Sequence, residues 1–113
     1  MNQDPSAKAS VAALLPGFGP LKENHAAYFT DDPDTVELPL SRLVSTRLRP
    51  DGVRNAAFLM AEAAAGRTER RNPISVIPRG DGDWLVVDGN STVAVARLSD
   101  WHSIPCKIEI GEG

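Results

Sequence analysis

One junction between a strand and a helix decides how this sequence is expected to fold, and it reads Trp84-Leu85-Val86-Val87-Asp88-Gly89-Asn90-Ser91-Thr92-Val93-Ala94-Val95-Ala96. The first four residues predict an apolar strand, and an Asp-Gly turn follows. Three small polar residues of the kind that start helices then precede an apolar helical run. The first N–H groups of such a helix lack internal partners and carry the positive end of its dipole, so the junction can hold a phosphate or carboxylate.

The composition is that of one soluble globular domain. The chain has 113 residues, 42% of them hydrophobic and 24% charged, which is enough to bury a modest single core. No segment approaches the roughly 20 apolar residues that a bilayer span requires. The first ten residues lack the long apolar core of a secretory signal. We therefore expect a cytoplasmic protein that does not enter a membrane.

The positive charge is concentrated in the middle of the chain. The net charge is −3, which argues against strong general affinity for nucleic acid. Between residues 42 and 71, however, seven arginines stand against three acidic residues. If these arginines converge in space, they form one anion-seeking face on an otherwise acidic protein.

The single cysteine and the two histidines exclude some kinds of site. Cys106 cannot form an internal disulfide, and together with His25 and His102 it gives no recognisable metal-ligand spacing, so no metal site is predicted. Alternation along Cys106–Ile110 predicts a half-buried strand in which Cys106 is a structural residue. Trp101 and His102 are interpreted as packing and loop residues.

Residues 1–34 are predicted to form an N-terminal arm. Ser6–Leu15 and Leu21–Phe29 each have the pattern of a short helix, and the breaker Pro16-Gly17-Phe18-Gly19-Pro20 separates them. We expect this arm to pack on the domain that follows or on a partner subunit, so a homo-oligomer joined through the arm is one expectation.

Residues 35–113 predict an α+β domain. Val36–Leu40 is expected to be an edge strand because Pro39 cannot donate a ladder hydrogen bond. The other predicted elements are a brief strand at Val44–Thr46, a helix at Val53–Ala65, a hairpin of Ile74–Ile77 with Trp84–Val87, a helix at Asn90–Leu98 and the strand at Cys106–Ile110. Helices and strands mix without strict βαβ alternation, so a small mixed sheet with packed helices is expected. Its predicted core comprises Leu38, Met60, Val76, Val86, Val95, Leu98 and Ile108.

From Val36 to Ile110 the sequence resembles the ParB/sulfiredoxin-like superfamily. The resemblance rests on the order of Val36-Glu37-Leu38-Pro39-Leu40-Ser41-Arg42-Leu43, a helix, Asn72-Pro73-Ile74-Ser75-Val76, Trp84 to Asp88-Gly89, and Ile104-Pro105 before the last strand. It implies that fold. In the superfamily, the segment after the Asp/Gly turn binds nucleotide phosphates or meets nucleic acid, and members include partition proteins that bind CTP, sulfiredoxins and a free-serine kinase.

At the junction itself the chain is a divergent variant of that superfamily. Many members carry His-Arg or Arg-Arg two to three residues beyond the glycine, where this chain has Ser91-Thr92. Sulfiredoxins place their reactive cysteine immediately before that pair, where this chain has Asn90, so sulfiredoxin activity is not expected. The chain also leaves no room for the helix-turn-helix domain of partition proteins, so sequence-specific operator binding is not expected.

These observations predict a small module that binds a nucleotide or another phosphorylated ligand at residues 88–92. Nucleic acid bound without sequence specificity is a further candidate partner, and a bound nucleotide could bring a divalent ion with it. The predicted site residues are Asp88, Gly89, Asn90, Ser91 and Thr92, with counter-charge from Arg47, Arg49, Arg54, Arg70 and Arg71.

Other interpretations of the same residues stay open. Asn90, Ser91 and Thr92 are ordinary helix-cap residues, Asp before Gly is ordinary turn chemistry, and arginines near the end of the helix at 53–65 can simply be solvated. The chain could instead be a phosphotransferase or nuclease of the superfamily, with Asp88 as its base or metal ligand. It could also be a protein-interaction domain without ligand chemistry.

Overall fold

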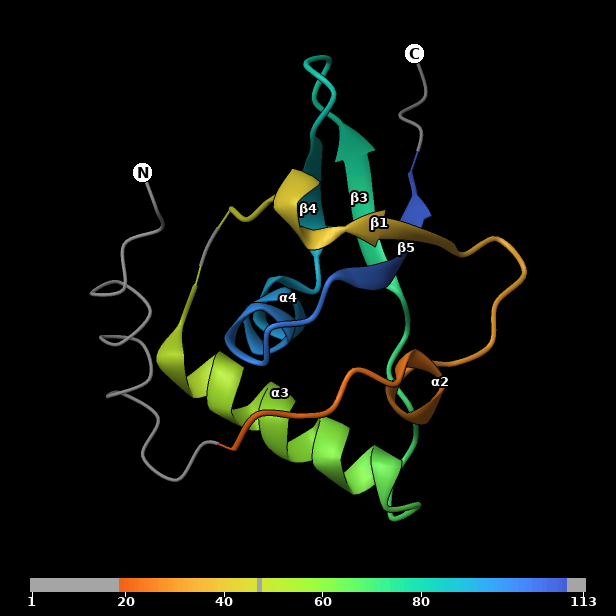
Figure 1. Cartoon of the computed structure of the whole chain (residues 1–113), viewed down its shortest axis with the longest axis vertical. Coiled ribbons are helices and arrows are strands. Elements are labelled where there is room, and N and C mark those ends of the chain that lie inside the picture. Colours follow the sequence, from red (N-terminus) through yellow and green to blue (C-terminus); the bar gives the residue numbers. More distant parts are fainter. Residues whose placement is uncertain (1–18, 47, 110–113) are drawn as a thin grey trace.

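The computed structural model describes residues 19–46 and 48–109, which form a five-stranded mixed sheet with helices packed against it (Figure 1). Its elements, in order, are α2 (His25–Tyr28), β1 (Val36–Pro39), the 3-10 helix η1 (Leu40–Arg42), β2 (Leu43–Val44), α3 (Pro50–Ala64), β3 (Ile74–Pro78), β4 (Trp84–Asp88), α4 (Asn90–Leu98) and β5 (Ser103–Ile108). The predicted α+β class is confirmed. Among the described helices, none is long and apolar enough to span a membrane.

The sheet has the strand order β1-β5-β3-β4-β2. β3 and β4 pair antiparallel, as expected for the predicted hairpin, and β5 lies parallel to β3 on its other side. β1 is antiparallel to β5, and the short β2 is parallel to β4. The predicted edge strand is therefore confirmed for residues 36–39, with Pro39 at its last position, opposite Ser103, whereas Leu40 begins η1.

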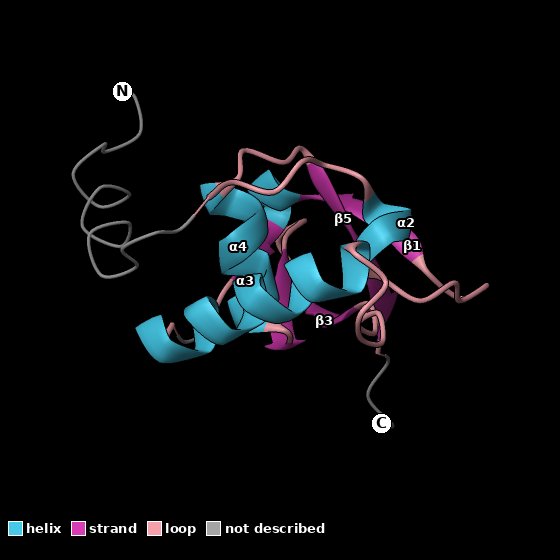
Figure 2. Ribbon diagram, turned by 90° about the horizontal axis from the view of Figure 1, so that it is seen from below, coloured by secondary structure: helices cyan, strands magenta, loops and turns pink. Residues whose placement is uncertain are grey.

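The core includes residues from the sheet and from α3 and α4, which lie side by side in Figure 2. Of the predicted core residues, four are buried: Met60, Val76, Val86 and Val95. The prediction was wrong for Ile108, whose side chain is 38% exposed, and Leu38 and Leu98 are only half-buried. Ile108 is exposed because β1 covers β5 only from Ser103 to Cys106.

The segment before β1 is less helical than its sequence pattern predicts. α2 spans four residues in place of the expected Leu21–Phe29. Tertiary hydrogen bonds hold the preceding backbone, since the Leu21 N–H donates to Ser99 Oγ (3.0 Å) and the Tyr28 hydroxyl donates to Lys22 O (2.8 Å). Tyr28 and Phe29 join the core. The predicted helix at Ser6–Leu15 lies outside the described residues.

β5 begins three residues before the strand predicted at Cys106–Ile110. Pairing with β1 extends it back to Ser103, a long-range effect that the local alternation does not contain. Cys106 is fully buried, as predicted, and burial raises the pKa of its thiol to about 12. Its protonated, enclosed sulfur fits a structural residue.

Candidate functional site

The turn between β4 and α4 strongly favours glycine. Gly89 has a φ of +100°, a left-handed conformation that residues with a side chain rarely adopt. A Cβ at this position would lie 2.7 Å from Cδ1 of the buried Ile74, so that side chain would also have to shift. α4 then begins at Asn90, where the sequence pattern predicts it.

The side chains after this glycine do not cap the helix. Gly89 occupies the N-cap position, and no side chain there accepts a capping hydrogen bond. Asn90 instead exchanges hydrogen bonds with Thr46: its Nδ2 donates to Thr46 Oγ1 (2.9 Å) and its Oδ1 accepts from the Thr46 N–H (3.0 Å). The cap interpretation of these side chains is therefore wrong, and Asn90 tethers the β2–α3 connection to α4.

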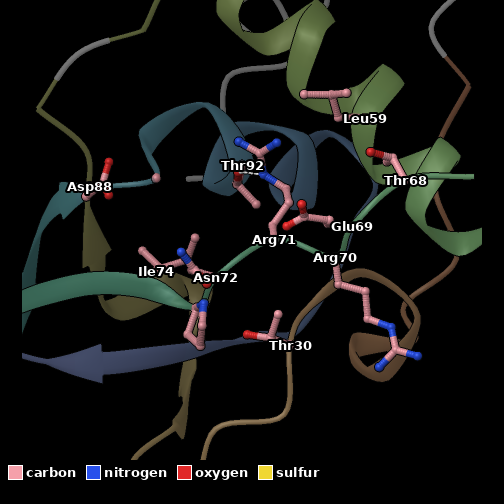
Figure 3. Close-up of a pocket in the computed structure, with 12 residues that line it drawn as sticks. Thr30, Leu59, Thr68, Glu69, Arg70, Arg71, Asn72, Ile74, Asp88 and Thr92 are labelled. Carbon is pink, nitrogen blue, oxygen red and sulfur yellow. Dashed lines mark hydrogen bonds between the residues drawn. The ribbon is translucent and has the colours of Figure 1, made fainter.

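Arg71 reaches the same junction from the connection between α3 and β3. Its Nε donates to Oγ1 of Thr92 at 3.0 Å, and Thr92 is only 1% exposed (Figure 3). Burial lowers the pKa of the Arg71 guanidinium, and the charge of Asp88 offsets part of that effect. Thr92 thus orients a half-buried cation whose desolvation the neighbouring carboxylate does not fully compensate.

Two adjoining hollows meet at this arginine, and we call them together the junction groove. One, of about 370 Å³, extends toward the α3–β3 connection, and the other, of about 550 Å³, extends toward the β2–α3 connection. The residues that line both hollows are Arg71, Asp88, Gly89 and Thr92. The predicted residues 88–92 therefore lie at the centre of a concave surface.

The N-terminal turn of α3 lies against the N-terminal turn of α4. A Cβ added to Gly52 would stand 2.8 Å from Ser91 Oγ, so the missing side chain permits this approach. The first hydrogen bonds inside the two helices run from Val53 to Arg49 and from Val93 to Gly89. The amides that precede Val53 and Val93 are not used within the helices, and both positive dipole ends are at the groove.

The predicted arginines do not converge on one face in the described residues. Arg49 and Arg71 line the groove. Arg70 lines one hollow, but its side chain is directed away from Arg71 in Figure 3. Arg54 is exposed and pairs with Asp51 at 2.7 Å, away from the groove lining, and Arg47 lies outside the described residues.

Two arginines of the same stretch, outside the predicted site, form ion pairs elsewhere. Arg42 pairs with Asp83 of the β3–β4 turn, and Arg67 pairs with Glu62 of α3. Several residues that line the groove lie outside the predicted site, among them Gly52 and Thr46. The pattern predicts a helix that begins at Val53, but α3 begins at Pro50, so only the structure shows that Gly52 lies inside it. Thr46 carried no signal in the sequence, since only the tertiary structure brings it to Asn90.

Asp88 is exposed and lies at the boundary of the two hollows. In the described part of the chain, no group of three or more His, Cys, Asp or Glu side chains is placed to hold a metal ion. A carboxylate in this position can accept a hydrogen bond from a ligand hydroxyl or contact a cation that arrives with a ligand.

The likeness of this chain to known proteins is one of structure. No family model and no curated protein matches the sequence. Among solved structures, a sulfiredoxin from Arabidopsis thaliana is similar, with a TM-score of 0.49 and 24% sequence identity, over 70% of this chain and 88% of that chain. Neither family nor function follows from a likeness at that level, so the groove is interpreted from its own residues.

Proposed function

We propose that the junction groove binds a nucleotide or another phosphorylated ligand. The observation that carries the proposal is the meeting of two helix N-termini at one groove that also contains the half-buried Arg71. Helix-terminal amides and a guanidinium are the groups that proteins use to hold phosphate oxygens.

The contacts differ from those a basic pair would make. The hydroxyl of Thr92 is buried and accepts the hydrogen bond from Arg71, so its role in binding is to orient the arginine. The ligand is then held by the free amides of α4, the Ser91 hydroxyl, Arg71 and the exposed Arg49. We expect modest affinity that falls with salt, because the Arg49 contribution is screened.

Asp88 favours a nucleotide over inorganic phosphate. An exposed carboxylate beside the groove repels a bare phosphate, whereas a sugar hydroxyl donates to it and a divalent ion bridges it to phosphate oxygens. A nucleotide with Mg²⁺ should therefore bind more tightly than phosphate alone.

Binding would be measured by thermal shift and titration calorimetry with inorganic phosphate and nucleoside mono-, di- and triphosphates, each with and without Mg²⁺. A ligand at a hundredfold excess over its dissociation constant stabilises the folded chain by about 2.7 kcal/mol. Arg71→Gln should weaken binding by about tenfold, the loss expected for one charge-assisted hydrogen bond.

A matched pair of charge reversals separates the groove from general electrostatics. Arg49→Glu and Arg54→Glu change the net charge equally and lie on either side of the first turn of α3, but only Arg49 lines the groove. Arg49→Glu should reduce affinity strongly, and Arg54→Glu should leave it within about twofold, as expected for a distant screened charge. A charged residue in place of Thr92 would not test the groove, because Thr92 is buried and a charge there would disturb the fold.

Three results would contradict the proposal. Equal losses of affinity in Arg49→Glu and Arg54→Glu would show that the ligand responds to the overall charge and not to the groove. If no phosphorylated ligand binds at millimolar concentration, the protein-interaction interpretation takes its place. Metal-dependent turnover of a bound ligand that Asp88→Asn abolishes would favour the phosphotransferase or nuclease interpretation.

A further inference from the structure

Away from the groove, the side chain of His25 is enclosed by hydrogen-bond acceptors. Its Nε2 lies 2.9 Å from the carbonyl oxygen of Ser103 and 3.1 Å from Oε2 of Glu23. Its Nδ1 lies 3.3 Å from Oε2 of Glu37. The side chain is 18% exposed and packs against the ring of Trp101, with ring centroids 5.6 Å apart.

This arrangement suits the doubly protonated ring. A neutral imidazole has one N–H donor and one nitrogen lone pair, whereas the imidazolium donates from both nitrogens. A carbonyl and two ionised carboxylates can only accept. In either neutral tautomer, one ring nitrogen would therefore direct its lone pair at an oxygen, and only the imidazolium satisfies both sides.

The groups that face His25 come from several elements. Glu23 precedes α2 and also accepts hydrogen bonds from the backbone N–H groups of His102 (2.8 Å) and Ser103 (3.3 Å). Glu37 of β1 is 63% exposed and accepts from the Ser103 hydroxyl of β5. The second histidine, His102, lies 3.2 Å from the same Glu23, but its side chain is 94% exposed.

Glu23 stays ionised over a wide pH range. Burial raises its pKa, but the hydrogen bonds from His102 and Ser103 and the charge of His25 outweigh burial, so the pKa is lowered overall. The ring of His25 thus faces two carboxylates and one carbonyl at neutral pH.

We infer that His25 is a proton-operated clamp, which in its doubly protonated form fastens the segment at residues 21–30 to β1 and β5 and releases it when that proton is lost. The fastened segment includes Tyr28 and Thr30, whose backbones bracket Arg71: the Arg71 N–H donates to Tyr28 O (2.7 Å) and the Thr30 N–H donates to Arg71 O (2.8 Å). Opening the clamp therefore loosens the backbone of a groove residue. The clamp itself requires no ligand.

The pH window follows from the groups at the clamp. The hold requires both ring protons of His25, so it weakens when the pH rises far enough to remove one of them. On the acid side, a carboxylate with a lowered pKa keeps its contribution until the pH falls through that pKa, so Glu23 maintains the hold well below neutral pH. The clamp should be tightest in mildly acidic solution.

Native-state hydrogen exchange of the Thr30 and Arg71 amides tests the inference, because both donate hydrogen bonds between the segment and the domain. After correction for intrinsic exchange, the population in which these hydrogen bonds are open should be larger at pH 8 than at pH 5.5. The Val93 amide, which donates to Gly89 O inside the domain, is the internal reference.

The two histidines provide the matched variants. In His25→Gln the amides should exchange with an open population that no longer depends on pH, and in His102→Gln the wild-type pH dependence should remain. Retained dependence in His25→Gln, or its loss in His102→Gln, would overturn the inference. Nitrogen NMR of the unsubstituted protein gives a test that needs no variant: a His25 ring with one unprotonated nitrogen at pH 5.5 would also overturn it.

Discussion

The junction groove and the His25 clamp both consist of polar groups near the surface, but their hydrogen bonds go to different places. In the groove, the first amides of α3 and α4 have no partner within their helices, and Arg71 uses its Nε for Thr92. In the clamp, both ring nitrogens of His25 and both oxygens of Glu23 have partners from the chain itself. Spare donors suit a site for an external anion, whereas a closed network suits an internal contact that responds to protons.

The two regions also differ in how their residues are distributed along the chain. The centre of the groove is the continuous stretch 88–92, which a sequence motif can reveal. The clamp joins Glu23 and His25 to residues about 80 positions later, and no local pattern marks it. Substitutions in the groove should therefore affect the protein through the turn between β4 and α4. Substitutions in the clamp should affect how the segment at residues 21–30 packs on the domain.

The largest effect on the groove should come from Gly89→Ala. We expect a loss of about 2–4 kcal/mol in the free energy of unfolding, from the left-handed conformation and from the clash with Ile74. Gly66→Ala is the control, since Gly66 also has a positive φ, of +78°, but open space around it. It should cost only about 1–2 kcal/mol in urea unfolding. Equal costs would mean that contact with Ile74 does not constrain the turn.

A smaller effect is expected from Trp101→Phe beside the clamp. The indole Nε1 donates to Leu21 O at 2.7 Å, and the ring stacks on Tyr28 with centroids 5.3 Å apart. Losing the hydrogen bond and part of the ring should cost about 1–2 kcal/mol in urea unfolding. Amide exchange at Thr30 should accelerate as well. Trp84→Phe, at a half-buried position on β4, should leave exchange at Thr30 unchanged; acceleration there would contradict a local role for Trp101.

The smallest effect should come from Glu23→Gln. Because the folded state lowers the pKa of Glu23, the ionised carboxylate stabilises the protein above the unfolded pKa of about 4.3, and that contribution is lost as the pH falls through the folded pKa. At pH 7 the substitution should cost less than about 1 kcal/mol, because the side chain is partly solvated.

The pH profile is the more sensitive measurement of this substitution. Urea unfolding followed from pH 6 to pH 3 should show a shallower acid loss for Glu23→Gln than for the unsubstituted protein. Glu109→Gln, which removes an exposed carboxylate just after β5, is the control. An unchanged profile for Glu23→Gln would mean that Glu23 holds the same protonation equilibrium in both states.

The sequence by itself determined the features that depend on neighbouring residues. The apolar strand, the glycine turn and the periodic apolar positions of α4 are local, so the bounds Asn90–Leu98 and the hairpin of β3 with β4 follow from the pattern. The burial of Cys106 follows from strand alternation for the same reason. The position of the groove centre at residues 88–92 is also contained in that one stretch.

Only the tertiary structure decided the features that depend on pairing between distant segments. β5 begins at Ser103 because β1 pairs with it. Residues 21–24 are not helical because the Leu21 N–H donates to Ser99 Oγ and the Leu21 carbonyl oxygen accepts from Trp101 Nε1. The arginines divide in the same way. Arg54 pairs with Asp51 three residues before it on α3, a contact that the local spacing allows. Arg49 and Arg71 reach the groove only because helix orientation and long-range contacts bring them there.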